Sequence, residues 1–373
     1  MKVIFLTSIP FIRQHCIDMY IDAIVKTFDV ALWDLSGVYG RQEVVKERDV
    51  DSLRIKSVKE FEKLLSEEKQ KTRIVVITNI LIPQLRRVYP VIHGLGIPII
   101  NINKESFASW MSFAGSVHLF GKIRLLSWLK ALTTYVPVSR KILNFYRNGN
   151  IKYDYCLSSY NFYPEQSRHF VRIHHVKYDE SRAAEKQAPV VNGRYILFID
   201  ASLADHPMYA KSRNKIDRHS YLGQLNHYFK MLEDHYKMPV VISAHPKSSY
   251  VDGDFEGRKV IMYQTPNLIQ YATYIVSHYS TSLFDAILQK KPFKVMYSDA
   301  LLRSATRGAT AMGIQMANML NVEKVNLDDP KVSAFTMDAD VYDRFSDRFI
   351  VNNEKLGYSN GELIVQFLKQ FEV

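Results

Sequence analysis

The chain has 373 residues, of which 47% are hydrophobic, and a formal net charge of +11. This length favours two domains, since single cores rarely grow beyond about 250–300 residues, and the ordinary apolar content excludes a disordered or fibrous chain. The two cysteines, Cys16 and Cys156, exclude a disulfide framework and a cysteine-based zinc site, which fits a reducing cytoplasm. The positive charge favours anionic partners, which include nucleic acid, a membrane surface and phosphorylated substrates.

The amino terminus begins with a short apolar run, residues 2–7, and no small-residue cleavage site follows it. The chain also lacks an uncharged apolar stretch of the roughly 18 residues that a transmembrane helix needs. We therefore expect a cytoplasmic protein with neither a signal peptide nor a membrane span.

The first half of the sequence alternates apolar runs typical of strands with helical patterns. Continuous Val and Ile runs suit parallel strands that are covered on both faces, and the alternation predicts βαβ units. The expected strands are residues 2–7, 30–35, 73–78, 97–102, 153–158 and 170–177. The expected helices are residues 12–27 and 61–69.

Residues 110–147 combine many apolar side chains with Lys and Arg and contain almost no acids. Two interpretations fit this composition: a pair of core helices with solvated basic side chains, or an amphipathic element that lies on a membrane surface. The second predicts peripheral association with anionic membranes at the inner face of the plasma membrane.

The second half restarts the alternation after a polar stretch, residues 181–193, which has few apolar side chains to tie it to a core. We predict an amino-terminal, acceptor-side domain over 1–180, a linker over 181–193, a nucleotide-sugar domain over 194–355 and a closing helical segment over 356–373. The expected strands of the second half are residues 195–200, 239–244, 259–263, 274–277 and 292–297. The expected helices are residues 220–236, 267–272, 280–289 and 360–371.

Two such Rossmann-like α/β domains are expected to face a central cleft. Ligands of open parallel sheets bind beyond the carboxyl ends of the strands. The residues that directly follow the strands of the second half are therefore the candidates for chemistry.

A carboxylate follows the first of these strands. Asp200 ends a run of apolar residues, where an acid is costly to bury unless it is paired or used. Asp205 and His206 lie further into the same loop and are second choices. In the first half, Glu105 follows the 97–102 strand and is a candidate for the opposite wall of the cleft.

An imidazole follows the next strand, within His245-Pro246-Lys247. His245 can donate a hydrogen bond to a phosphate oxygen or transfer a proton. Pro246 disfavours helical geometry at His245 and so holds it at the strand edge. Lys247 adds a positive charge for a phosphate.

Three consecutive hydroxyls, Ser280-Thr281-Ser282, follow a third strand and begin the expected 280–289 helix. A helix amino terminus offers unpaired N–H groups and the positive end of its dipole, so it suits a phosphate, although a serine here can also be a plain helix cap. These residues are predicted to hold the phosphate of a nucleotide.

Several other patterns are missing. No Gly-x-Gly-x-x-Gly motif follows a strand, and neither a Gly-Lys-Ser/Thr phosphate loop nor a Gly-x-Ser-x-Gly elbow occurs. Asp328-Asp329 lies outside a strand pattern, and the adjacent His174-His175 pair would not easily share a metal. We expect no metal and no cofactor.

The motifs of residues 194–297 resemble those of bacterial GT-B glycosyltransferases that carry a His-Pro motif and a downstream Ser/Thr motif. That group includes sialyltransferases and enzymes that use CMP-activated ulosonic acids such as Kdo. The resemblance rests on Asp200, Asp205-His206-Pro207, Ala244-His245-Pro246-Lys247, Ser277–Ser282 and Lys291-Pro292.

The resemblance implies a metal-independent GT-B enzyme that transfers a sugar to a bacterial surface glycan, such as capsule, O-antigen or lipooligosaccharide. His245 and the Ser280–Ser282 hydroxyls would contact the phosphate of a CMP-linked donor. The acidic Asp/Glu-Asp/Glu-Gly motif that supplies the base of sialyltransferases is absent, so Asp200 becomes the candidate nucleophile or base and Glu105 the candidate acid/base group. Alternatives are a UDP- or GDP-sugar glycosyltransferase, a nucleotide-sugar epimerase, and a basic protein that binds nucleic acid or membranes.

Overall fold

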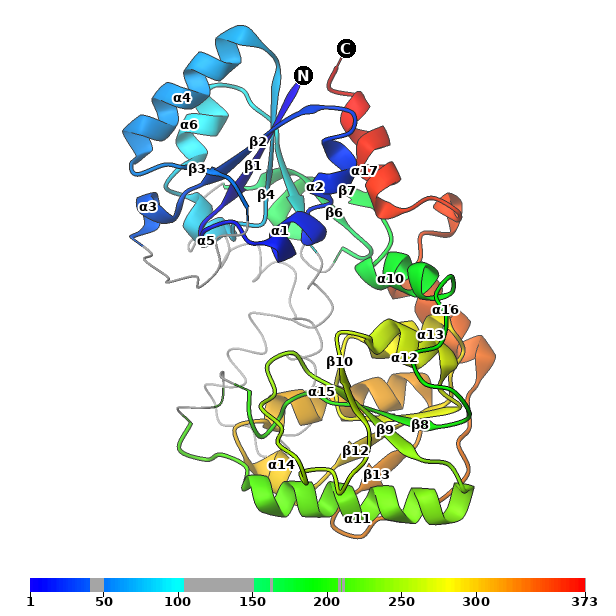
Figure 1. The fold of residues 1–373 in the computed structure, drawn as a ribbon. Helices are drawn as coiled ribbons and strands as arrows, with labels where there is room; N and C mark the ends of the chain where they lie inside the picture. The colour runs from blue at the N-terminus through cyan, green and yellow to red at the C-terminus, as the bar shows by residue number, and fades with distance from the viewer. Residues whose placement is uncertain (41–49, 104–150, 162–163, 207–208, 210–211, 373) are drawn as a thin grey trace. The chain divides into compact units, whose positions relative to one another are not determined.

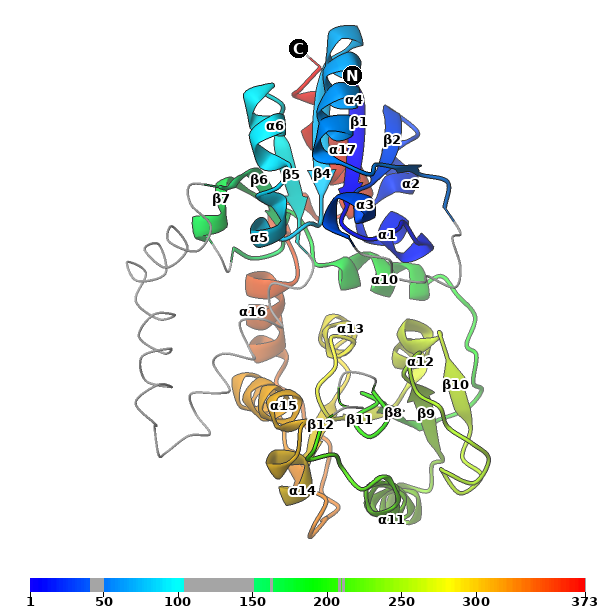
Figure 2. The same ribbon diagram turned by 90° about the vertical axis from the view of Figure 1, so that its left-hand side faces the viewer.

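The computed structural model describes residues 1–40, 50–103, 151–161, 164–206, 209 and 212–372 (Figures 1 and 2). The chain divides into two compact units. Of the described residues, the first unit contains those up to 103, 151–176 and 351–372, and the second contains those from 177 to 350. Glu105 and the basic, apolar segment 110–147 lie outside the described residues.

The first unit is built on a parallel sheet with the strand order β3-β2-β1-β4-β5-β6-β7. The central strands β1, β4 and β5 are buried on both faces, as their Val and Ile runs predict, whereas the strands toward the two edges are partly exposed. The strands are β1 (Lys2–Thr7), β2 (Asp29–Asp34), β3 (Leu53–Arg54), β4 (Ile74–Thr78), β5 (Ile99–Ile102), β6 (Tyr153–Ser158) and β7 (Ser167–Arg172).

Helices cover both faces of this sheet (Figure 2). The helices of the first unit are α1 (Arg13–Asp18), α2 (Ile21–Ile24), α3 (Ser36–Tyr39), α4 (Val58–Lys71), α5 (Ile82–Leu85), α6 (Tyr89–Gly94) and α17 (Asn360–Lys369), with short 3₁₀ turns at Pro164–Gln166 and Asn353–Lys355. The helix expected over 12–27 is interrupted at Tyr20, whose φ of 57° is left-handed.

The carboxyl-terminal helix α17 belongs to the first unit, although the chain reaches it after the second. It packs on α2 and contributes Leu363, Ile364 and Leu368 to the core. Gly361 lies so close to α2 that a Cβ atom there would be 2.7 Å from Ala23 Cβ. The last segment thus closes the first unit's core.

The second unit also contains a parallel sheet, with the order β10-β9-β8-β11-β12-β13. Its strands are β8 (Ile196–Ile199), β9 (Val240–Ala244), β10 (Val260–Met262), β11 (Tyr274–Ser277), β12 (Phe293–Tyr297) and β13 (Lys324–Asn326). Its helices are α10 (Val176–Ala184), α11 (Arg218–Tyr236), α12 (Thr265–Tyr271), α13 (Leu283–Leu288), α14 (Asp299–Arg303), α15 (Arg307–Leu320) and α16 (Ala339–Phe349). Helix α11 covers one face, and α12 and α13 lie on the other (Figures 1 and 2).

Two parallel α/β sheets confirm the predicted pair of Rossmann-like domains. The boundaries differ from the expected ones. The division falls at Val176 and Lys177, where α10 begins, so the first residues of the expected 181–193 linker are helical. The second division falls at Ile350, before the expected limit of 355.

No helix in the described part of the chain combines the length and apolar character that crossing a membrane requires.

Candidate functional site

Three polar strand ends lie side by side in the second sheet. Strands β9, β8 and β11 are neighbours, and their register places Ile199 beside both Ser243 and Ser277. The Ser277 hydroxyl donates to the Ile199 carbonyl at 2.9 Å, which ties two of these ends together. Because the strands are parallel, the residues that follow them emerge at one edge of the sheet.

Asp200, directly after β8, is a buried carboxylate whose two oxygens both accept hydrogen bonds. Oδ1 accepts from the Ser202 amide at 2.8 Å. Oδ2 accepts from the His245 amide at 3.1 Å and from the Ser248 hydroxyl at 2.7 Å. The side chain is only 3% exposed. This geometry suits a residue that joins the loops after β8 and β9 better than it suits a nucleophile, which must reach the substrate.

Tyr250 lies in the same network. Burial raises the pKa of its phenol, and the Asp200 carboxylate raises it further. The Tyr250 hydroxyl therefore stays neutral beside the Asp200 carboxylate.

His245, directly after β9, is half-buried, and its ring orientation is fixed. The Lys247 amide donates to its Nδ1 at 3.1 Å, so the proton of the neutral imidazole lies on Nε2. Burial lowers the pKa of His245; the Asp200 carboxylate opposes this shift, and Lys247 adds to it. Pro246 and Lys247 are both exposed, so a positive charge is open to solvent beside His245.

A second imidazole accompanies the first. The rings of His206 and His245 have their centroids 5.6 Å apart, with an angle of 61° between their planes. Burial lowers the pKa of His206, and the charges of Lys247 and His245 lower it further. His206 is only a second choice in the sequence analysis, although the His-Pro dipeptide that it shares with His245 is a signal that favours it as a site residue.

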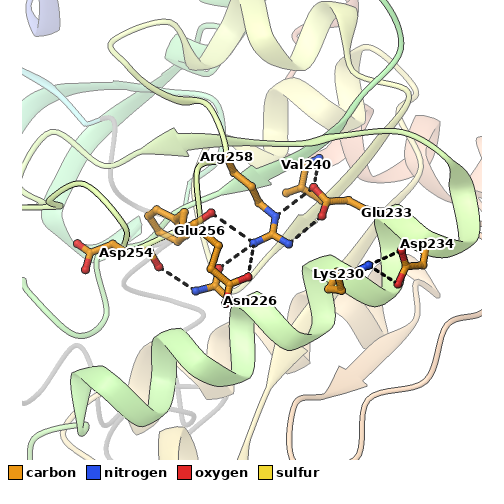
Figure 3. Close-up of polar contacts among 9 residues, drawn as sticks. Asn226, Lys230, Glu233, Asp234, Val240, Asp254, Glu256 and Arg258 are labelled. Atoms are coloured by element: carbon orange, nitrogen blue, oxygen red, sulfur yellow. Dashed lines mark hydrogen bonds and ion pairs between the residues drawn. The ribbon is translucent and has the colours of Figure 1, made fainter.

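Two arginines hold the loops that carry these imidazoles. Arg218 pairs with Asp205, in the His206 loop, and with Asp254, in the connection after β9. Arg258, at the end of that connection, forms a bidentate pair with Glu233 of α11 at 3.0 and 2.8 Å and donates to Asn226 at 3.0 Å (Figure 3).

Two residues that bind Arg258, Asn226 and Glu233, also hydrogen-bond to the backbone of the β9 region. Asn226 donates to the Asp254 carbonyl at 2.9 Å, and Glu233 accepts from the Val240 amide at 2.9 Å (Figure 3). Bidentate arginine–carboxylate pairs fix geometry more strictly than single contacts do. The later part of the His245 loop and the first residue of β9 are therefore both tied to α11.

The hydroxyl segment differs from its expected form. Helix α13 begins at Leu283, not at Ser280, and has only six residues. The Ser280 hydroxyl accepts from the Ser282 amide at 3.2 Å, and the amides of Leu283 and Phe284 donate to the carbonyls of Ser280 and Thr281. The amides of Ser282, Leu283 and Phe284 are thus already bonded within a turn. A phosphate at these three residues would have to bind the hydroxyls instead. Thr281 is the exposed one of the three.

His278, at the end of β11, has a structural role. Its ring is buried, with Nδ1 2.9 Å from the Met296 carbonyl and Nε2 2.9 Å from the Tyr221 hydroxyl. Burial lowers the pKa of His278 to about 4, although the Met296 carbonyl and the Asp200 carboxylate both act to raise it. The neutral imidazole thus accepts from Tyr221 and donates to β12. Gly313 permits the close approach of α15, since a Cβ there would lie 3.2 Å from the His278 carbonyl oxygen.

A buried acid follows the hydroxyl segment on α13. Asp285 has no solvent exposure, and its Oδ2 lies 3.4 Å from the Lys177 ammonium of α10. Neither of its oxygens has a hydrogen-bond partner among the described residues. Burial raises its pKa to about 7, although Lys177 opposes the rise.

Two cavities of about 580 and 330 Å³ lie in the first unit. The larger is at the amino ends of β4 and β5 and includes Lys69, Lys71 and Arg73 among its lining residues. The smaller is at the carboxyl ends of β1 and β2 and includes Asp34 and Arg54. Neither contains a predicted site residue.

No family model matches the chain, and no curated protein matches its sequence. Solved structures similar to it include UGT2 of Phytolacca americana complexed with UDP-2fluoro-glucose and pterostilbene, at 10% identity over 99% of this chain and 93% of that one, with a TM-score of 0.47. The UDP-GlcNAc 2-epimerase of Methanocaldococcus jannaschii in complex with UDP-GlcNAc and UDP is 13% identical over 99% and 100%, with a TM-score of 0.46. The glycotransferase of kitacinnamycin is 10% identical over 99% and 98%, with a TM-score of 0.48.

Proposed function

We propose that the chain is a glycosyltransferase whose second unit binds the phosphate of a nucleotide-sugar donor at His245. The observation that carries this proposal is the half-buried imidazole at the carboxyl edge of a parallel sheet, with its proton on Nε2 and Lys247 beside it. Ligands of open α/β sheets bind at this edge, and an imidazole with an adjacent ammonium suits a phosphate group.

The donor is proposed to be a CMP-linked ulosonic acid, as the His-Pro and Ser/Thr motifs imply, with a bacterial surface glycan as acceptor. A UDP- or GDP-sugar is the alternative donor. In this proposal Ser280, Thr281 and Ser282 offer hydroxyls to the same phosphate, and Asp200 positions His245. Glu105 stays a candidate acid/base group, and metal-independent transfer at the inner membrane face stays a prediction.

Replacing His245 with Gln is expected to weaken nucleotide binding by roughly tenfold to a hundredfold. The reason is the loss of a hydrogen bond to a charged group, which is worth about 1.5–3 kcal/mol. The measurement is calorimetric titration with CMP, UDP and GDP, followed by assays of nucleotide release from the matching nucleotide-sugars. His227→Gln, an exposed histidine on α11, is the matched control.

Binding of one nucleotide by the wild type, with loss in the His245 variant alone, supports the proposal and identifies the donor class. Equal nucleotide release by the wild type and the His245 variant would contradict the assigned site. A wild type that binds none of the three nucleotides would contradict the function itself.

A further inference from the structure

The second unit carries two His-Pro dipeptides, and they follow neighbouring parallel strands. His206 lies in the loop after β8, and His245 comes directly after β9. Their ring centroids are 5.6 Å apart. One imidazole at such an edge is an ordinary polar residue, whereas two in contact form a cluster that can gain positive charge.

The protein fixes this pair from several sides. Asp200 accepts from the amide of His245 at 3.1 Å and from the hydroxyl of Ser248 at 2.7 Å. The His206 amide donates to the Ser202 carbonyl at 2.8 Å, which closes a turn in the loop after β8. Arg218 joins the two loops through Asp205 and Asp254. The imidazoles are thus held in place before any ligand arrives, which lowers the entropic cost of binding.

The groups around the pair keep it neutral when the site is empty. Burial lowers the pKa of both imidazoles, and Lys247 lowers both further. His245 itself lowers the pKa of His206. Asp200 opposes the shift at His245, but its oxygens are taken by amides and Ser248.

Within the part of the chain that the structure describes, the other groups seen beside His206 add little negative charge. The Tyr209 ring lies 5.9 Å from the His206 ring, and burial raises the pKa of its phenol, so it stays neutral. Asp205 is engaged with Arg218. A bound anion would therefore bring the negative charge that the pair lacks, and protonated imidazoles would become favourable.

We propose that His206 and His245, with Lys247, form a paired-imidazole site for one phosphate group of the donor, and that binding takes up a proton from solvent. This inference rests on the proposed function and adds a pH response to it. The proton goes onto His206, since His245 already carries its proton on Nε2 and its Nδ1 accepts from the Lys247 amide; it is released when the nucleotide leaves. Donor affinity therefore rises as the pH falls and weakens as the pH rises.

The test needs a ligand whose own phosphate does not titrate. Cytidine 5′-(methyl phosphate), a phosphodiester, and UDP-glucose serve as the probes. Calorimetric titrations between pH 6 and 8, in two buffers of different ionisation enthalpy, give the number of protons taken up. If one proton is taken up, the Kd is expected to increase by up to about tenfold for each unit by which the pH rises.

His206→Gln is expected to bind the same probe more weakly, with a smaller proton uptake and a flatter pH dependence. His227→Gln, the exposed histidine of α11, is expected to behave as the wild type does. Binding by the wild type without proton uptake, or an unchanged uptake in His206→Gln, would overturn the paired site and leave the proposed function standing. Failure of the wild type to bind either probe or a GDP-sugar would instead count against the proposed function.

Discussion

Replacing Asp200 with Asn is expected to lower the free energy of unfolding by about 1–3 kcal/mol and to weaken nucleotide binding about tenfold. The reason is that Asn has one side-chain oxygen for two backbone N–H donors, those of Ser202 and His245, so in either orientation its NH2 group faces one of these donors. A buried amide left without an acceptor carries its full desolvation cost. His245 would then lose its fixed position beside Lys247.

This result separates two roles for Asp200. A nucleophile or general base changed to Asn would leave nucleotide affinity and stability unchanged while transfer stopped. A positioning residue changed to Asn would lose affinity and stability together with transfer. Urea unfolding measures the stability, and nucleotide titration measures the affinity. The control is Asp234→Asn, since Asp234 forms an exposed pair with Lys230.

Replacing Asp285 with Asn is expected to stabilise the protein by a few kcal/mol above pH 7 and to give no such gain near pH 4. Burial raises the pKa of this acid from 3.8 to about 7, and one pKa unit corresponds to about 1.4 kcal/mol. The partner ammonium, Lys177 Nζ, lies at 3.4 Å and also pairs with Glu180. The charged carboxylate is therefore poorly compensated.

The sign of the effect follows from proton binding. Because the folded pKa is above the unfolded one, the folded state holds more protons between about pH 4 and 7. The contribution of Asp285 to stability therefore falls as the pH rises through this window, and its full cost is present above it.

Urea unfolding at pH 4 and pH 8 measures this difference. Asp343→Asn, in an exposed pair with Lys290, is expected to change stability little at either pH. A less stable Asp285 variant at pH 8 would mean that Lys177 fully compensates the buried charge.

The sequence allowed the parallel sheets to be predicted because the short Val and Ile runs of strands such as Arg73–Thr78 and Val240–Ala244 are typical of parallel strands covered on both faces. The division of the chain was harder to predict. Residues 181–184 look polar, yet they continue α10, where Ser181 and Ala184 are buried and the Ser181 hydroxyl accepts from Gln289 at 3.0 Å. Helix propensity and hydrophobicity do not reveal a packing surface that is made of small side chains.

Helix α16 has no counterpart among the expected elements, although its signal was present. Tyr342, Phe345 and Phe349 recur at helical spacing, and Asp338 caps the first turn. Helix α13 was expected to begin at Ser280, since a serine before an apolar run suggests a cap. In the structure the Ser280 hydroxyl bonds the Ser282 amide instead, which delays the helix by one turn.

The site itself was partly predictable. Strand order is enough to bring Asp200 and His245 together, because both follow neighbouring parallel strands. The direction in which Asp200 points was not predictable, since it depends on Ser202 and Ser248, two small residues in loops. Likewise, the contact of His206 with His245 depends on the curl of a loop and on the Arg218 pairs.

The most direct test of the central claim is a crystal of this protein soaked with CMP. The account predicts that the phosphate lies within hydrogen-bond distance of His245 Nε2 and near Lys247, at the carboxyl edge of β8 and β9. Nucleotide bound elsewhere, with His245 free of contact to the phosphate, would contradict it.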